Sequence, residues 1–414
     1  MKGIAGALAA LALIALPGLG LAKESALKLD RKRIERSVAG MVDSGRTVGA
    51  SVLVWQGGKE RLFTAAGLAD REAARPFLRD TLVQIFSMTK PVTGVALMQL
   101  WEQGKFGLDD PVARHLPELA NLQVADGAAL RAPARAVTVR DVLRHTAGFT
   151  YGGGEGPADR VWAEQQPLAL SHDLAEFGRR LGKVPLLADP GTRWHYSAAV
   201  DVQALLVERL SGQKFADYVR DHIFRPLGMN DSAWRRSPAD RARFAALYQG
   251  GETGPLTRVG DKEWLESNFM DAAMTMGGSG IVCTVDDYMR FARMLLGKGS
   301  LDGVRVLKPS TLQLMATDQL DPRITERLWL PGKGAVGFGF DFAVRVKQPQ
   351  TPEEARGAVG EFFWDGYPSM LFWVDPANDL AVVFATQKIP FDATLHRTIR
   401  EAVYGKGYLG PKGD

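Results

Sequence analysis

The 414-residue sequence contains a single cysteine, Cys283. No disulfide can form within the chain, so the fold must be stabilised by packing alone. Its six histidines are scattered, and no two of them have the spacing of metal ligands on a helix, which argues against a structural zinc site. We therefore expect neither a metal ion nor a cofactor.

Lysine and arginine form no block that would follow a phosphate backbone, and 51 basic residues against 47 acidic ones leave a net charge of only +4. Nucleic acid is therefore not an expected partner. Apolar residues make up 46% of the chain and charged residues 24%. This composition is typical of a globular protein with a large core.

Only one stretch, residues 4–21, is apolar and long enough to span a bilayer. Lys2 precedes it, and small residues at 20–22 separate it from a polar segment. A charged start, an apolar middle and small residues at the break are typical of a signal peptide. We predict that residues 1–22 are cleaved and that the chain 23–414 is exported, periplasmic or secreted, with no stable membrane span. An uncleaved anchor is the alternative, which the Pro and Gly residues near the end of the run disfavour.

Apolar periodicity predicts helices and strands in a definite order along the chain. A helix is expected at 28–42, followed by an antiparallel hairpin whose strands, 48–55 and 61–66, flank Gln56-Gly-Gly58. The middle of the chain is predicted to be mostly helical, with clear examples at 139–145, 200–210, 216–223 and 286–296. The final part returns to strands and ends in a helix: 338–346, 361–364, 370–374, 380–386 and 394–403.

Strands at both chain ends around a helical middle predict an α/β protein of the α+β type. One antiparallel sheet is expected to be assembled from both termini, with flanking helices and a mostly helical lobe. We predict a single domain over 23–414, with the α/β part at about 23–95 and 330–410 and the helical lobe at about 96–329.

The pattern Ser-x-x-Lys occurs three times, at 25–28, 87–90 and 211–214. At the start of a helix it places a hydroxyl and an amine on one face, one turn apart. Only Ser87 lies where an apolar run leads into an apolar helix. A lysine desolvated there can lose its proton and accept one from the serine, while the helix N-terminus favours negative charge. A helix-capping serine and a surface lysine are the alternative.

Longer motifs surround Ser87 in a characteristic order: Phe86-Ser-Met-Thr-Lys-Pro91, Thr138-Val-Arg-Asp-Val-Leu-Arg-His-Thr-Ala-Gly-Phe149, Trp194-His-Tyr-Ser197, Phe224-Arg-Pro-Leu-Gly-Met229, Met276-Gly-Gly-Ser-Gly-Ile281 and Phe372-Trp-Val-Asp-Pro376. In these motifs the chain resembles the serine β-lactamase and penicillin-recognising superfamily. It is most similar to class C β-lactamases and family VIII carboxylesterases, over nearly the whole mature chain. The resemblance implies a β-lactamase-like fold.

The resemblance also implies a catalytic trio. Ser87 matches the nucleophile and Lys90 its lysine, and Tyr196 matches the tyrosine that serves as general base or proton relay. Lys90 is expected to lower the pKa of the Tyr196 phenol as a nearby cation. Whether lysine or tyrosine takes the serine proton stays open, and a core tyrosine is the alternative for Tyr196. Ala198 stands where β-lactamases carry an asparagine that binds the substrate amide.

The third element of the family is Lys-Thr-Gly, which this chain lacks. Trp364-Asp-Gly366 resembles the Trp-x-Gly form of the family VIII esterases. A glycine is expected there because the backbone must approach the substrate closely. The resemblance places the oxyanion hole at the backbone N–H groups of Ser87 and Tyr367. An ordinary turn at a strand end is the alternative.

These departures bear on the substrate. Trp364 supplies no cation for a substrate carboxylate, Asp365 would repel an anion if it faces the cleft, and Ala198 lacks the amide. Tyr151 and the glycine-rich loop 152–156 are expected to border the acyl pocket. We therefore expect a carboxylesterase that acts through an acyl-enzyme on small uncharged esters. A β-lactamase or D-alanyl-D-alanine carboxypeptidase is one alternative, and an inactive penicillin-binding-like protein that binds cell-wall peptides is another.

Some motifs are interpreted as structural. Gly332-Lys-Gly-Ala-Val-Gly337 spells a dinucleotide fingerprint but precedes a strand, so we predict a loop. Ser279 lacks the second glycine of a nucleophile elbow. His145 is expected to cap a helix end, and His195 to point away from the site if its segment is extended.

Overall fold

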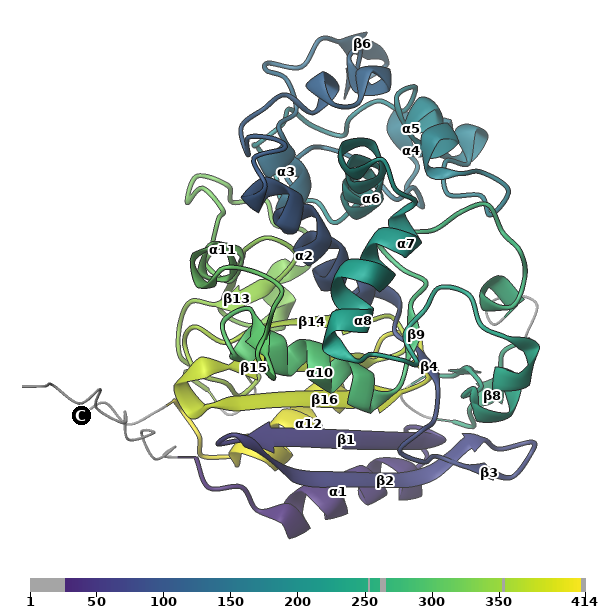
Figure 1. Ribbon diagram of the computed structural model, residues 1–414, viewed down its shortest axis with the longest axis vertical. Coiled ribbons are helices and arrows are strands. Elements are labelled where there is room, and N and C mark those ends of the chain that lie inside the picture. The colour runs from purple at the N-terminus through teal and green to yellow at the C-terminus, as the bar shows by residue number, and fades with distance from the viewer. Residues whose placement is uncertain (1–26, 252–253, 261–265, 352–353, 411–414) are drawn as a thin grey trace, which may run out of the picture.

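The computed structural model describes residues 27–251, 254–260, 266–351 and 354–410. Its central element is an eight-stranded antiparallel sheet (Figure 1). From one edge to the other the strands are β12 (Val336–Phe338), β13 (Ala343–Arg345), β14 (Phe362–Gly366), β15 (Met370–Asp375), β16 (Leu380–Thr386), β1 (Gly49–Gln56), β2 (Lys59–Asp70) and β3 (Arg75–Pro76). Strands from the two ends of the chain meet at β1 and β16, where Ala50 lies opposite Thr386. The predicted sheet built from both termini is confirmed.

Helices cover both faces of this sheet, which explains why β15 and β16 are buried along their whole length. The helices α1 (Arg31–Asp43) and α12 (Ala393–Tyr404) pack together on one face. The helix α10 (Val285–Leu296) packs against β15, β16 and β1 on the other (Figure 1). There the ring of Tyr288 lies 4.9 Å from that of Phe372, in an edge-to-face arrangement typical of aromatic pairs in cores.

A helical lobe stands above the sheet in Figure 1. Its helices are α2 (Thr89–Glu102), α3 (Val139–Leu143), α4 (Pro157–Gln165), α5 (Leu174–Leu181), α6 (Ala199–Ser211), α7 (Phe215–Val219), α8 (Arg225–Leu227) and α11 (Pro309–Met315). Helix α2 is buried on nearly all sides because it lies on the side of the lobe that faces the sheet and packs against α6. Its apolar sequence therefore reflects its central place.

The other strands that the structure describes form short ribbons outside the large sheet. They are β4 (Val83–Gln84) with β9 (Val282–Cys283), β5 (Val124–Asp126) with β6 (Ala129–Arg131), β10 (Ser300–Leu301) with β11 (Val304–Arg305), and β17 (Lys388–Ile389) with β7 (Tyr248–Gln249) and β8 (Thr257–Arg258). The pair of β4 and β9 holds the segment that leads into α2 against the segment that leads into α10.

One predicted strand is wrong. The segment 338–346 is not continuous, because the chain turns between β12 and β13. Gly339 packs against the carbonyl oxygen of Met315, where a side chain would not fit, and Asp341 adopts a left-handed φ of 62°. These tertiary constraints override the apolar pattern that suggested one strand.

The predicted boundaries between the α/β part and the helical lobe stay a prediction, although α10 packs on the sheet from within the range 96–329. The predicted signal peptide, residues 1–22, lies outside the described residues. Across the described part of the chain, every helix is too short or too polar to cross a membrane.

Candidate active site

Ser87 lies at the N-terminal end of the buried helix α2. A 3₁₀ turn, Phe86–Met88, runs directly into the helix, and Phe86 has a left-handed φ of 45°. Ser87 is half-buried and lines a cavity of about 790 Å³. The free N–H groups of a helix start carry partial positive charge, so this position favours an anion developing beside the serine.

Lys90 follows one turn later and is almost fully buried, at 2% exposure. Its Nζ donates hydrogen bonds to Ser87 Oγ at 3.1 Å and to the carbonyl oxygen of Gly278 at 2.7 Å. Burial lowers the pKa of Lys90 to about 8, against the opposing effect of the carboxyl groups of Asp201 and Asp341. A neutral amine is therefore accessible near neutral pH, and it is placed to accept the proton of Ser87.

Tyr196 completes the predicted trio. Its phenol accepts a hydrogen bond from Trp364 Nε1 at 3.4 Å, and Tyr196 and Ser87 line the same cavity. Lys90 Nζ lies 4.6 Å from the centroid of the ring. Burial raises the pKa of Tyr196 above its usual range, so the predicted lowering by Lys90 is wrong: the cost of a desolvated phenolate exceeds the attraction of the cation. These pKa shifts favour Lys90 over Tyr196 as the group that takes the serine proton.

Gly278 sets how closely the loop before β9 approaches these groups. A Cβ at this position would lie 2.6 Å from Tyr151 Oη, 3.1 Å from Asp201 Oδ2 and 3.2 Å from Lys90 Nζ. Tyr151, predicted to border the acyl pocket, has its ring 5.7 Å from that of Tyr196 and 5.4 Å from Lys90 Nζ. The structure thus places Tyr151 beside the catalytic candidates.

The end of strand β14 forms the opposite wall. A Cβ on Gly366 would lie 2.5 Å from the carbonyl oxygen of Ile85. The close approach that this glycine permits is thus to the protein's own backbone just before Ser87, not only to a substrate. Tyr367 follows with its ring 6.1 Å from that of Phe86, and Ser87 and Tyr367 line the same cavity. Their backbone N–H groups as an oxyanion hole stay a prediction.

The ring of His145 packs against the ring of Tyr196. His145 follows α3 with a left-handed φ of 57°, and the next N–H, that of Thr146, donates to the carbonyl oxygen of Asp141 at 2.9 Å. This is the geometry of a helix C-terminal cap, so the predicted capping role is confirmed. The buried ring lies 4.8 Å from that of Tyr196 and accepts a hydrogen bond from Ser197 N at 3.3 Å. Burial and the nearby Lys90 hold the pKa of His145 well below its usual value.

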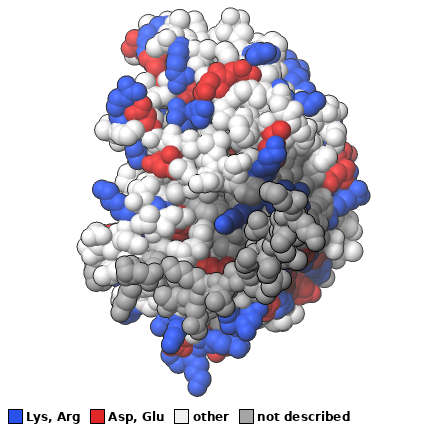
Figure 2. Space-filling model, turned by 60° about the vertical axis from the view of Figure 1, so that its left-hand side comes forward, with Lys and Arg blue, Asp and Glu red and all other residues white. Residues whose placement is uncertain are grey.

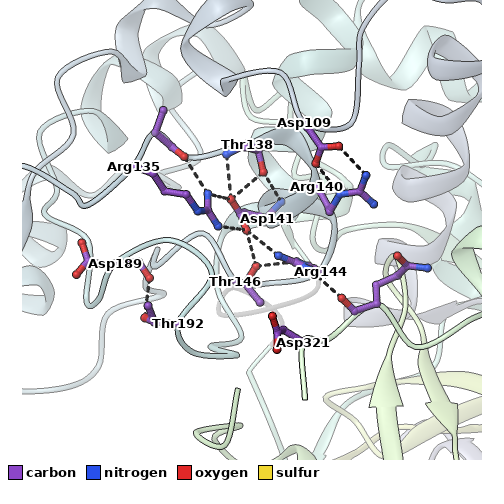
Figure 3. Close-up of polar contacts among 12 residues, drawn as sticks. Asp109, Arg135, Thr138, Arg140, Asp141, Arg144, Thr146, Asp189, Thr192 and Asp321 are labelled. Atoms are coloured by element: carbon purple, nitrogen blue, oxygen red, sulfur yellow. Dashed lines mark hydrogen bonds and ion pairs between the residues drawn. The ribbon is translucent and has the colours of Figure 1, made fainter. Parts of the chain in front are cut away.

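A buried carboxylate, Asp141, binds the residues on either side of His145, Arg144 and Thr146, and these contacts are drawn in Figure 3. It is 0% exposed. Its oxygens accept hydrogen bonds from four side chains: Arg135, Thr138, Arg144 and Thr146. Two cations and two hydroxyl groups thus satisfy the buried charge, and sequence analysis did not anticipate this network. Asp141 acts on the site only through the position of the turn.

Sequence analysis also missed Lys333. Lys333 ends a 3₁₀ turn (Leu330–Lys333) in the segment 332–337, which was predicted to be a loop but whose last two residues already belong to β12. Its ammonium group forms an ion pair with Asp365 on the cavity wall. Asp365 faces the cavity, which was the condition for the expected repulsion of anions. Its carboxylate is paired with Lys333, however, so it does not act as an isolated negative charge, and the expectation is corrected on this point. No local sequence pattern predicts this contact, because the two residues are 32 positions apart.

On the face drawn in Figure 2, basic and acidic side chains are interspersed over the surface. Within the ranges that the structure describes, no three His, Cys, Asp or Glu side chains are grouped so that they could hold a metal ion.

Comparisons with known proteins agree with this architecture. The sequence model of the Beta-lactamase family matches residues 34–404. Protein Rv1367c of Mycobacterium tuberculosis is 34% identical over 367 residues, covering 86% of this chain and 90% of that protein. Esterase EstB of Burkholderia gladioli is 32% identical over 383 residues, covering 87% of this chain and 92% of the esterase.

Among solved structures, EstCE1, described as a hydrolase with promiscuous acyltransferase activity, superposes with a TM-score of 0.77. It shares 28% sequence identity, and the match covers 90% of this chain and 98% of EstCE1. The β-lactamase-like fold that the motifs implied is thereby confirmed. The protein described here belongs to the Beta-lactamase family and is an enzyme of its serine-hydrolase class.

Proposed function

We propose that the protein is a carboxylesterase that forms an acyl-enzyme on Ser87 with small, uncharged carboxylic esters. The observation that carries this proposal is the pair of Lys90 and Ser87, 3.1 Å apart at a cavity of about 790 Å³. A buried amine whose pKa is lowered to about 8 beside a hydroxyl is the arrangement that makes a serine nucleophilic.

In the first step, neutral Lys90 takes the proton of Ser87 as Oγ attacks the ester carbonyl carbon. The carbonyl oxygen becomes an oxyanion, and we expect the backbone N–H groups of Ser87 and Tyr367 to bind it. Collapse of this intermediate breaks the bond to the alcohol. Tyr196 keeps its phenol proton and can donate it to the departing alkoxide, and Lys90 then returns a proton to the phenol.

In the second step, a water molecule attacks the acyl-enzyme by the same route in reverse and releases the carboxylic acid and free Ser87. An alcohol in place of water would give a new ester. The likeness to EstCE1 supports this acyl transfer as a second candidate activity, while the likeness to EstB supports ester hydrolysis. Export of the mature chain after cleavage near residue 22 is part of the same proposal.

The test uses purified chain 23–414 with 4-nitrophenyl butyrate and with a chromogenic cephalosporin. We expect turnover of the ester, far slower turnover of the cephalosporin, and loss of both in Ser87→Ala. Ser211→Ala is the matched control, because Ser211 begins another Ser-x-x-Lys. Its hydroxyl donates to Val207 O at 2.6 Å and accepts from Gln213 N at 3.1 Å, both backbone groups of its own helix end. Faster cephalosporin turnover would favour the β-lactamase alternative, and no turnover of either would favour a binding protein.

A further inference from the structure

A lysine and an aspartate form an ion pair inside the wall of the Ser87 cavity. Lys333 comes from the loop before β12 and Asp365 from strand β14. Each side chain is only 10% exposed, and the Lys333 ammonium group contacts the Asp365 carboxylate directly. Both residues line the cavity together with Ser87 and Tyr196. The pair is therefore part of the surface that a substrate meets.

Three aromatic rings surround the Lys333 ammonium group. Its Nζ lies 4.9 Å from the centroid of Trp329, 5.1 Å from Trp364 and 5.0 Å from Phe391. At these distances each ring face attracts a cation. With Asp365 they form a site for a positive charge that the protein's own lysine already occupies.

The lining carries other charged groups as well. Among the described residues these are Glu354, Arg397 and Arg400. Arg400 Nη1 donates to both carboxylate oxygens of buried Glu361, at 2.9 and 3.0 Å. Glu354 and Arg397 have opposite signs. Burial lowers the pKa of His396 to about 4, so this imidazole is neutral at physiological pH.

A substrate carboxylate that enters this cavity would lose its hydrating water. The ammonium group that it would meet, that of Lys333, is already paired with Asp365. Such a desolvated charge is costly unless a free partner receives it. The Asp365 carboxylate would also repel it at short range. A substrate cation would meet the reverse problem, since Lys333 fills the aromatic cage. An uncharged acyl group incurs neither cost.

We propose that the Lys333–Asp365 pair sets the charge preference of the Ser87 cavity: each side chain masks the other, so neutral esters are selected over anionic and cationic ones. This inference rests on the proposed esterase activity and names the residues that define its substrate class. Asp365 acts on an anionic substrate both by direct repulsion and by masking Lys333, as a specificity residue rather than a catalytic one.

The experiment compares kcat/KM for three 4-nitrophenyl esters of similar size: the neutral pentanoate, the anionic hemisuccinate and the cationic 4-(trimethylammonio)butanoate. Asp365→Asn unmasks Lys333, and we expect the ratio of hemisuccinate to pentanoate to rise at least about tenfold, mainly through KM. The gain should shrink as ionic strength rises. In Asp365→Asn combined with Lys333→Met the gain should disappear.

Lys333→Met provides an independent arm if the first variant fails to fold. It leaves Asp365 and the three rings without their cation, so the ratio of the cationic ester to pentanoate should rise about tenfold. An unchanged ratio in both single variants, or a hemisuccinate gain that persists in the double variant, would overturn the inference. Pentanoate turnover by the unaltered protein, lost in Ser87→Ala, tests the esterase proposal separately in the same assay.

Discussion

Lys90 donates a hydrogen bond to Ser87 from a buried position, where the charged form of the amine is unfavourable. The two atoms are 3.1 Å apart, and the amine is held on its other side by Gly278 O at 2.7 Å. Because burial lowers the pKa of this lysine to about 8, the neutral and charged forms differ little in free energy near physiological pH. The pair is thus arranged for proton transfer in both directions.

Activity should therefore follow the protonation of Lys90. Below pH 8 most of the amine is charged and only the neutral fraction can take the serine proton, so kcat/KM for 4-nitrophenyl butyrate should rise with pH and level off above about 8. Lys90→Arg stays protonated throughout and should lose about 10²- to 10⁴-fold in rate. A flat profile between pH 6 and 9 would contradict a lysine base.

Tyr196 is expected to protonate the departing alcohol. Tyr196→Phe keeps the ring and removes the proton, so kcat for ethyl butyrate should fall about 10²-fold. The fall should be much smaller for 4-nitrophenyl butyrate, because 4-nitrophenolate leaves without a proton. Equal losses on both esters, with KM unchanged, would instead indicate that the phenol only positions Ser87.

Gly278 leaves no room for a side chain. Gly278→Ala would place a Cβ 3.2 Å from Lys90 Nζ and 2.6 Å from Tyr151 Oη, which should displace the amine and lower kcat/KM at least about tenfold while the protein stays folded. Gly40→Ala is the matched control, since no atom lies within 4 Å of its added Cβ. Full activity in Gly278→Ala would show that the amine has more freedom than its contacts indicate.

Asp141 should matter for stability more than for chemistry. Asp141→Asn leaves Arg135 and Arg144 without their buried carboxylate (Figure 3) and should lower the free energy of unfolding by about 3 kcal/mol in urea titrations. Asp109→Asn breaks only an ion pair whose aspartate is 73% exposed, and it should cost less than about 1 kcal/mol. Similar losses in the two variants would argue against the buried network.

The fold was largely predictable because its strands and helices carry their own patterns. The apolar runs of β1 and β16, at opposite chain ends, already implied one sheet. The exception, 338–346, depends on Gly339 packing against the backbone at Met315. Such a contact joins distant parts of the chain and leaves no local pattern.

The candidate site was predictable only in part. Ser87, Lys90 and Tyr196 came from motifs and are brought together in the structure. The direction of the pKa shift of Tyr196 was wrong because it depends on burial, which no spacing reveals. Lys333 was missed for a similar reason. The role of a lysine in a loop depends on the residue that it contacts in the fold, here Asp365, and the sequence does not show that contact.

The central claim is that Ser87 carries the acyl group. The most direct measurement is intact-protein mass spectrometry after rapid quenching with 4-nitrophenyl butyrate, followed by peptide mapping. We expect a butyryl adduct on Ser87 that forms and decays at the rate of turnover. In Ser87→Ala both the adduct and ester hydrolysis should be absent. An adduct on another residue, or hydrolysis that survives in Ser87→Ala, would contradict it.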